Sequence, residues 1–498
     1  MATTLRIRTA IVLLAAGLAL AGCSGNSSHS AGRAGGAPAG APIYRGDPSS
    51  DAGHGFSPEV DPADHPQSTF AMDIDTASYG YAASLIRHGS RPDPSVVRPE
   101  EFINAVPEQY PQPAGNGFTV NVDGTRLPQT HRLSNQGDVR LLRVGLQTRA
   151  QNQDGRPDAA LTFVIDVSGS MGEPGKLDVV REALNDLIDR LRPTDSVAIV
   201  TFSDEATVVR PMTRVAERSD LHRAVDGLRA TDSTNLEAGL VRGYQVARDG
   251  LRPGATNRVV LLSDGLANMG DTVASSILAR VKENAAKQIT LLGVGVGQQY
   301  GDQLMEQLAD QGDGYVIYAS GLDDTRAAFR EQLPATIPIR ALDAKVQVTF
   351  DPKAVAAYRL IGYDDRALAD SAFRDDRADG GEVFAGHSVT ALYTVRLKPS
   401  AGGTVAQVHT RWQDPDTHNA QETGATVSVS DLNGDFAEAV PRLQACYTAA
   451  YFAENLRQSP YANQTRLTDL ASIAADAAQR TGDQSVSDLA ALINQVGD

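Results

Sequence analysis

The sequence predicts an α/β protein in which a doubly wound, mainly parallel domain is inserted in a β-sandwich, followed by a C-terminal helical segment. Three observations predict this arrangement. Between residues 158 and 333, continuous apolar runs alternate with segments whose apolar residues recur at helical spacing, as in a parallel sheet covered on both faces. Strand-like runs lie both before and after this region. From Phe436 the apolar residues follow helical spacing to the end of the chain.

The central region, residues 158–333, contains the apolar runs that we interpret as parallel strands. Most of them are continuous rather than alternating, which is typical of strands buried on both faces. The expected strands are Leu161–Val167, Val197–Phe202, Val259–Leu262, Ile289–Val296 and Tyr315–Ala319. Helices are expected between them, over Val180–Leu191, Leu236–Ala247, Asp271–Lys287 and Gln303–Gln311.

The flanking regions contain further strands on both sides of the central domain. They are expected over Val120–Leu127, Val139–Thr148, Val346–Phe350, Val389–Leu397, Val405–Trp412 and Thr426–Val429. We expect residues 58–157 to contribute helices and sandwich strands, and residues 334–434 to supply the rest of the same sandwich. Residues 435–498 are expected to form the C-terminal helices.

The N-terminus predicts an exported lipoprotein. Arg6 and Arg8 precede an apolar stretch, Ile11–Leu20, that is too short to span a bilayer, as in a signal peptide. The sequence Leu-Ala-Gly-Cys that ends at Cys23 resembles a lipobox, which implies that Cys23 carries lipid and becomes the first residue of the mature protein. Residues 1–23 are therefore the predicted signal peptide and lipobox. Residues 24–57, rich in Gly, Ala, Ser and Pro, are predicted to form a disordered tether.

This interpretation predicts a location in the cell envelope. No later segment is apolar over the thickness of a bilayer, so the expected membrane attachment is the lipid alone. The protein would face outward, on the plasma membrane or in an outer membrane. The other cysteine, Cys446, then has no disulfide partner and is expected on a buried helix face.

The composition and the absence of several motifs argue against some classes of function. The chain has 45 Lys and Arg against 61 Asp and Glu, a formal net charge of −16. Such a surface repels nucleic acid and anionic lipid headgroups. The sequence has no H-E-x-x-H zinc motif, no paired Cys and His ligands and no G-x-S-x-G elbow. Gly293, Gly295 and Gly297 follow a strand without the dinucleotide-binding spacing and are interpreted as a tight turn. We therefore expect a binding protein rather than an enzyme.

Oxygen-bearing side chains cluster where the first central strand ends. Asp166, Ser168 and Ser170 alternate along the chain, so in an extended segment they point the same way. Two other polar segments, Thr231–Asn235 and Ser263–Gly265, are expected at the same end of the sheet, because ligands bind beyond the carboxyl ends of such strands. Hydroxyl and carboxylate oxygens suit Mg²⁺. The sequence therefore predicts a divalent-cation site there.

These segments resemble the von Willebrand factor type A domain over residues 158–333. Five residues match its metal ion-dependent adhesion site: Asp166, Ser168, Ser170, Thr234 and Asp264. The resemblance implies that the three hydroxyls bind the ion directly and that both carboxylates act mainly through bridging water. It implies one Mg²⁺, or Mn²⁺ or Ca²⁺ in its place. An acidic side chain of a protein partner would replace an exchangeable water on the ion.

The flanks resemble a bacterial family of type A domain lipoproteins. The resemblance rests on residues 70–79, 98–104 and 110–113 before the central domain, and on residues 358–363, 385–393 and 459–461 after it. The family's C-terminal domain has no known function. One alternative therefore stays open, a structural or assembly scaffold of the cell envelope that uses its flanking domains while the metal site plays no adhesive part.

A second acidic cluster, formed by Asp73, Asp75 and Ser78, lies in the N-terminal flank. It could bind a cation. The favoured interpretation is that these side chains cap a helix over residues 76–88.

Overall fold

The computed structural model describes residues 43–44, 56–151, 155–231, 233–265, 271–297 and 302–497. The predicted signal peptide with Cys23 and most of the predicted tether lie outside these residues. Within the predicted tether, Ile43 and Tyr44 form a short strand, β1 (Ile43–Tyr44), and Ser57 donates to the carboxylate of Asp364 from its backbone N–H, at 2.7 Å.

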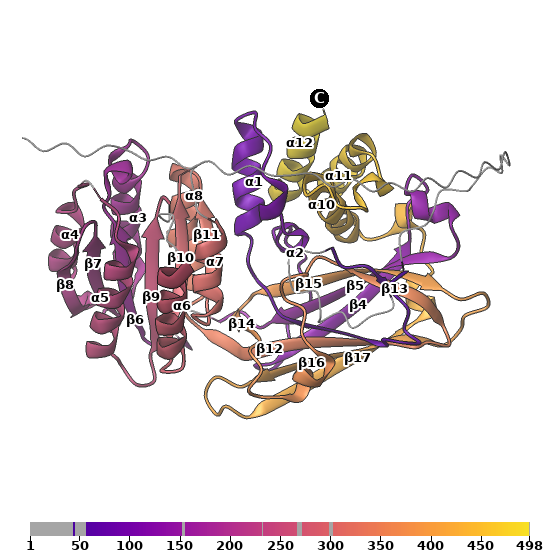
Figure 1. The fold of residues 1–498 in the computed structure, drawn as a ribbon, viewed down its shortest axis with the longest axis horizontal. Helices are drawn as coiled ribbons and strands as arrows, with labels where there is room; N and C mark the ends of the chain where they lie inside the picture. The colour runs from indigo at the N-terminus through magenta and orange to yellow at the C-terminus, as the bar shows by residue number, and fades with distance from the viewer. Residues whose placement is uncertain are drawn as a thin grey trace, which may run out of the picture. The chain divides into compact units, whose positions relative to one another are not determined.

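The central domain is a sheet with strand order β11-β10-β9-β6-β7-β8 (Figure 1). All of its neighbouring strands pair in parallel except β7 and β8, which pair antiparallel. The strands are β6 (Ala159–Asp166), β7 (Ser196–Phe202), β8 (Ala206–Arg214), β9 (Thr256–Ser263), β10 (Ile289–Val296) and β11 (Tyr315–Ala319). The predicted parallel strands are therefore present, and β8 is an additional edge strand that the sequence did not predict.

Helices cover both faces of this sheet. The helices α3 (Leu177–Arg190) and α4 (Arg218–Asp226) pack on one face together with residues 328–337, in a core that includes Leu161, Phe163 and Phe329. The other face is covered by α5 (Leu236–Asp249), α6 (Asp271–Ala285) and α7 (Asp302–Asp310). The helices α8 (Leu322–Ala327) and α9 (Leu333–Ala335) complete the domain. Burial of both faces explains the continuous apolar runs of these strands.

Strands from before and after the central domain share two mainly antiparallel sheets. One sheet has the order β1-β2-β13-β15-β5-β4, and the other has the order β14-β12-β16-β17, with β3 paired to β12. Strand β15 pairs with β5 along its whole length, although the central domain separates them in the sequence. The bounds are β2 (Glu59–Val60), β3 (Gln67–Ala71), β4 (Phe118–Arg126), β5 (Val139–Thr148), β12 (Ile339–Phe350), β13 (Val355–Ile361), β14 (Gly381–Phe384), β15 (Ser388–Leu397), β16 (Thr404–Gln413) and β17 (Ala420–Ser428).

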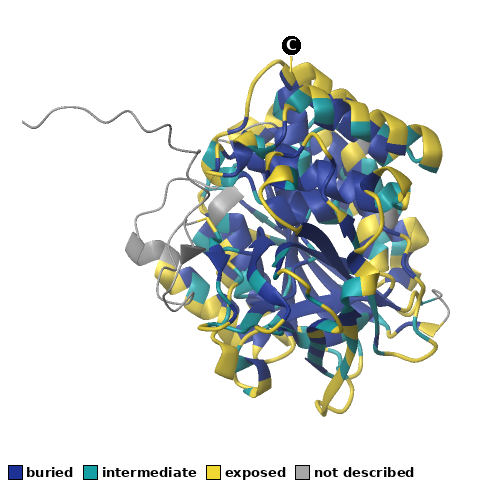
Figure 2. Ribbon diagram, turned by 90° about the vertical axis from the view of Figure 1, so that its right-hand side faces the viewer, coloured by how far each residue is buried: buried dark blue, intermediate teal, exposed yellow. Residues whose placement is uncertain are grey.

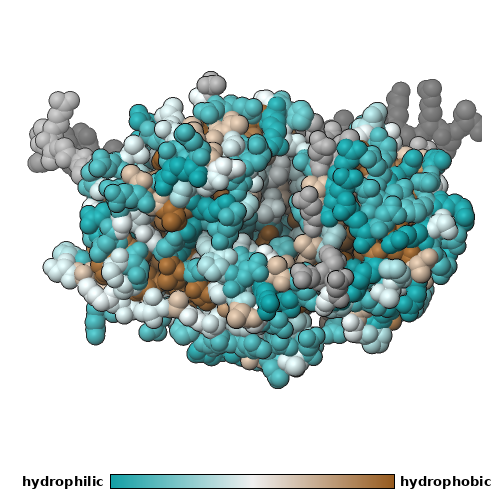
Figure 3. All heavy atoms as spheres, turned by 180° about the vertical axis from the view of Figure 1, so that it is seen from behind, coloured by the Kyte–Doolittle hydropathy of each residue, from teal (hydrophilic) through white to brown (hydrophobic). Residues whose placement is uncertain are grey.

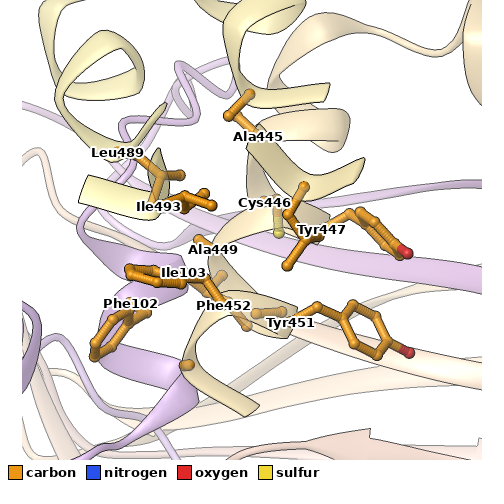
Figure 4. Packing of buried hydrophobic residues seen from close by; sticks show 14 of the residues in the cluster. Phe102, Ile103, Ala445, Cys446, Tyr447, Ala449, Tyr451, Phe452, Leu489 and Ile493 are labelled. Carbon is orange, nitrogen blue, oxygen red and sulfur yellow. The ribbon is translucent and has the colours of Figure 1, made fainter. Parts of the chain in front are cut away.

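The C-terminal helices pack with helices of the N-terminal flank in a further core, which also includes residues of β5, β13 and β15. It joins α1 (Ala77–Arg87) and α2 (Pro99–Asn104) to α10 (Pro441–Leu456), α11 (Leu467–Thr481) and α12 (Gln484–Gly497). Phe102 of α2 meets Phe452 of α10 edge to face at 6.1 Å, and Ile493 of α12 lies in the same cluster (Figure 4). Cys446 is buried in α10, as expected, and forms no disulfide with any residue that the structure describes. The predicted fold class is thus confirmed, while the domain boundaries stay predictions.

Burial follows this architecture. Buried residues fill the strands and the inward helix faces, and exposed residues lie on the outer turns (Figure 2). Hydrophilic residues cover most of the face seen in Figure 3. Among the described residues, no helix has both the length and the apolarity needed to cross a bilayer.

Candidate cation site at the end of the central sheet

Four of the five predicted site residues lie at or just after the carboxyl ends of β6 and β9. These strands are parallel neighbours, with Ile165 opposite Leu262, so Asp166 and Ser263 end them side by side. Asp264 follows Ser263 directly, and a short 3-10 turn, Gly169–Gly172, follows Ser168. Sheet register alone therefore brings two of the predicted loops together.

Asp166 is fully buried and held at both carboxylate oxygens. Its Oδ1 accepts a hydrogen bond from the backbone N–H of Ser168 at 2.8 Å, and its Oδ2 accepts one from the Ser263 hydroxyl at 2.7 Å. Burial raises the pKa of Asp166 above its ordinary value, although these hydrogen bonds oppose the shift. The two hydrogen bonds thus fix the orientation of the Asp166 carboxylate.

A chain of oxygens leads from β6 to β9. The hydroxyls of Ser168 and Ser170 lie 3.1 Å apart, and the Ser170 hydroxyl donates to Oδ1 of Asp264 at 3.0 Å. Neighbouring oxygen ligands about 2.1 Å from a Mg²⁺ ion stand about 3.0 Å apart in an octahedron. The spacing of the two serine hydroxyls therefore fits adjacent positions around such an ion, and the Asp264 carboxylate lies beside them, bonded to Ser170.

Thr234 lies on a third loop, which is anchored at both ends. On one side, the backbone N–H of Thr231 donates to the carbonyl of Val167 at 2.6 Å. Val167 lies between Asp166 and Ser168 in the chain, so this bond ties the third loop to the first. On the other side, Asn235 caps α5 by accepting from the N–H of Ala238 at 3.0 Å. Thr234 is half-buried between these anchors. Among the described residues, no hydrogen bond joins its hydroxyl to the other four predicted ligands.

Sequence reasoning missed Lys176, which reaches into this site. Its ammonium lies 2.7 Å from Oδ2 of Asp264 and 2.8 Å from the Glu173 carboxylate. Burial lowers the pKa of Lys176, but the hydrogen bonds to Asp264 and Glu173 outweigh burial, and the net shift is upward. A lone lysine just after the Asp166–Ser170 motif, facing an acidic loop, was the signal that could have identified it.

The donor set is rich in hydroxyls rather than in classical metal ligands. Within the described ranges, no group of three or more His, Cys, Asp and Glu side chains could hold a metal. The loop after β6 instead offers the carboxylate of Asp166 with two serine hydroxyls, and the loop after β9 adds the carboxylate of Asp264. Such oxygens suit a hard, oxygen-preferring cation.

The second acidic cluster of the sequence has a different role from the one predicted. Thr76 begins α1 without a side-chain cap, so the capping interpretation is wrong. Asp73 instead accepts from the N–H of Asp75 at 2.7 Å, and both carboxylates face the guanidinium of Arg366.

Family models match three parts of the chain. Residues 160–331 match the von Willebrand factor type A domain, and residues 55–134 match a model described as von Willebrand factor. Residues 335–407 match the C-terminal domain described for the uncharacterized protein YfbK. The central domain is therefore a von Willebrand factor type A domain, flanked by an N-terminal segment and a C-terminal domain that match these two models, while the predicted lipid attachment stays a prediction.

The chain is also similar to individual proteins over most or part of its length. The chain is similar to the uncharacterized protein YfbK of Escherichia coli, at 28% identity over 435 residues, which cover 81% of this chain and 73% of that protein. It is 31% identical over 157 residues to human inter-alpha-trypsin inhibitor heavy chain H4, covering 30% of this chain and 17% of that protein. A solved von Willebrand factor type A structure from Catenulispora acidiphila, at 18% identity, covers 73% of this chain and 88% of that chain, with a TM-score of 0.48.

Proposed function

We propose that this protein binds an acidic side chain of a protein partner through a divalent cation held at the end of the central sheet. Ser168, Ser170 and Thr234 would bind the ion directly, and Asp166 and Asp264 would act mainly through water. The ion, Mg²⁺ or Mn²⁺ or Ca²⁺ in its place, would supply an electrophilic centre with a replaceable water. The observation that carries this proposal is the oxygen chain from Ser168 through Ser170 to Asp264.

The protein's own groups prepare this site. Hydrogen bonds from the Ser168 N–H and the Ser263 hydroxyl fix the orientation of the Asp166 carboxylate. The hydroxyl oxygens are neutral, and they leave most of the cation's charge available for an incoming carboxylate. The same arrangement gives a reason for selectivity against neutral ligands.

Cation binding is the first test. Purified protein is titrated with Mn²⁺ and followed by electron paramagnetic resonance. Ser168→Ala removes one hydroxyl, and Ser219→Ala, on the exposed face of α4, serves as the matched control. We expect Ser168→Ala to bind Mn²⁺ at least about tenfold more weakly, a loss of about 1.4 kcal/mol, while Ser219→Ala binds as the wild type does. Equal affinity in all three proteins would sink the proposal.

Partner capture is the second test. Membrane extracts are passed over immobilised protein with Mn²⁺ or with EDTA. The proposal expects a captured protein that is lost with EDTA and with Asp264→Asn, and is retained by the exposed Asp249→Asn control. Capture that resists both treatments would favour the scaffold alternative.

We also propose that Cys23 carries the lipid that attaches the protein to the cell envelope. The sequence around Cys23 supports this proposal. Cys23→Ser should move the protein from the detergent phase to the aqueous phase in a Triton X-114 partition. The other cysteine provides the control, because Cys446→Ala changes a buried thiol in α10 and leaves the lipobox intact. Equal partitioning of Cys23→Ser and wild type would contradict lipidation.

A further inference from the structure

Lys176 brings a fixed positive charge to the candidate cation site. Its side chain is 13% exposed, and its ammonium bridges Glu173 and Asp264. The carboxylate of Glu173 is 67% exposed and therefore screened by water. The carboxylate of Asp264 is 5% exposed, so this half of the bridge is the stronger electrostatic contact.

Helix stability does not explain this position. Lys176 is the N-cap residue of α3 and makes no side-chain cap. A cation at a helix N-terminus opposes the helix dipole, where Ser, Thr, Asp or Asn would be favourable. The lysine therefore costs stability at its own helix, and its favourable contacts lie across the site.

The end of β10 is shaped to admit the lysine stem. Gly297 has a φ of +85°, and a Cβ there would lie 3.2 Å from Cε of Lys176. Its carbonyl is held by the hydroxyl of Tyr318 at 2.6 Å. A larger residue at Gly297 would be strained and would crowd the path by which the ammonium reaches Asp264.

The two carboxylate oxygens of Asp264 face different groups. Oδ2 faces the ammonium at 2.7 Å, while Oδ1 accepts from the Ser170 hydroxyl at 3.0 Å. One oxygen is thus neutralised by the lysine, and the other is left facing the hydroxyls that would hold a cation.

We propose that Lys176 sets the charge of the cation site, weakening its hold on the divalent cation and leaving the loaded site positive toward a carboxylate. This inference rests on the proposed function. The carboxylates of Asp166 and Asp264 together balance a divalent cation. The ammonium of Lys176 then adds a positive charge near the ion that only the water-screened carboxylate of Glu173 offsets, and it repels the ion while attracting an anionic ligand.

The test uses the full-length protein with two variants of this lysine and one control. Lys176→Met removes the charge and keeps the length of the side chain, and Lys176→Arg keeps the charge. Lys353→Met, at an exposed position of the sandwich, is the control. Mn²⁺ affinity is measured by electron paramagnetic resonance. Binding of a synthetic peptide with one glutamate, and of its glutamine counterpart, is measured by calorimetry on the Mn²⁺-loaded protein.

The proposal expects opposite changes in the two affinities. Lys176→Met should bind Mn²⁺ about tenfold more tightly and the glutamate peptide several-fold more weakly, while Lys176→Arg and Lys353→Met stay near wild type. A merely structural role would lower both affinities of Lys176→Met. That result, an unchanged Mn²⁺ affinity, or an unchanged peptide affinity would each overturn the proposal.

The failure of the proposed function has a different signature. In that case the wild type binds the glutamate and glutamine peptides equally well with Mn²⁺ present. If neither the wild type nor Lys176→Met binds Mn²⁺, both the proposed function and the role of Lys176 are refuted. Thermal unfolding of every variant shows whether a lost affinity reflects a lost fold.

Discussion

The carboxylate of Asp75 accepts a hydrogen bond from the backbone N–H of Val316 at 3.0 Å. Val316 lies on β11, the edge strand of the central sheet. Edge strands present unpaired backbone groups that native proteins cover. Here the cover is the N-terminal flank, since Tyr81 of α1 also meets Tyr318 of β11 edge to face at 5.4 Å. The N-terminal flank therefore covers the β11 edge of the central sheet.

Asp75→Ala should destabilise the protein by about 1–3 kcal/mol, because a buried N–H loses its acceptor. Asp75→Asn retains an acceptor oxygen and should cost less. Thermal unfolding gives the order of stability, and hydrogen exchange at Val316 should accelerate in Asp75→Ala before global unfolding. An alanine variant as stable and as protected as the wild type would show that the edge of β11 needs no cover.

Arg366 extends this contact into a network that joins three parts of the chain. It lies in the segment after β13 and pairs with Asp73 and Asp75 of the N-terminal flank and with Asp310 of α7, the last at 2.8 Å. Burial raises the pKa of Asp310, an effect that the nearby Arg366 opposes. The flanks and the central domain are thus linked by charge as well as by sheet pairing.

The sequence predicted the parts of the fold that depend on local pattern. Continuous runs such as Ile289–Val296 became buried parallel strands because hydrophobic burial on both faces needs that composition. Strand β8 was not predicted because its alternate residues are exposed and Pro211 interrupts it, so it contains no continuous apolar run. The helix α4 was not predicted either, because only two of its residues, Leu221 and Val225, are buried and they give too weak an apolar pattern.

The residues of the candidate site were predicted from their motif, but the positive charge that Lys176 brings to the site was not. Asp166, Ser168 and Ser170 are close in sequence, so their spacing revealed them. The partner of Lys176 is Asp264, 88 residues away in the chain, and Arg366 pairs with Asp73 across 293 residues. Pairs of this kind depend on the final packing of distant elements, which no local pattern encodes.

Gly239 controls how closely α5 approaches the sheet, and α5 starts directly after the Thr234 loop. A Cβ at Gly239 would lie 2.6 Å from Cδ1 of Phe202. In Gly239→Ala, overpacking should cost about 1–3 kcal/mol against a gain of about 1 kcal/mol in helix propensity. We expect a lower unfolding temperature and weaker Mn²⁺ binding, because the shifted helix moves Thr234.

The control for this prediction is Gly402→Ala, where an added Cβ would meet nothing within 4 Å. That variant should match the wild type in both measurements. Unchanged Mn²⁺ binding in a destabilised Gly239→Ala would argue that Thr234 is not a ligand.

Glu100 makes stability depend on pH. It is buried, its Oε2 has no hydrogen-bond partner, and burial, with Asp364 and Asp73 nearby, raises its pKa to about 7. The folded state thus keeps a proton that the unfolded state loses above its ordinary pKa. Stability from this group is complete at low pH and is lost as the pH rises through about 7.

Glu100→Gln is neutral at every pH, so its stability relative to wild type should rise by about 3 kcal/mol between pH 5 and pH 8. Urea unfolding at both pH values measures the difference. The exposed Glu205→Gln should show no such change. A constant difference between Glu100→Gln and wild type would mean that Glu100 is ionised throughout this range.

A buried ion pair anchors the C-terminal helices to the sandwich. Arg359 of β13 donates to Oε1 of Glu454 in α10, and both side chains are at most 2% exposed. The guanidinium also lies 3.5 Å from the ring centre of Tyr461.

Glu454→Ala would leave the Arg359 guanidinium buried without its counter-ion and should destabilise the protein by about 3–5 kcal/mol. The double variant Arg359→Met with Glu454→Met removes both charges and should recover most of that loss, because desolvation of an ion pair offsets much of its attraction. Urea unfolding followed by near-ultraviolet circular dichroism measures both. A double variant less stable than Glu454→Ala would show that the pair is favourable beyond the cost of burying it.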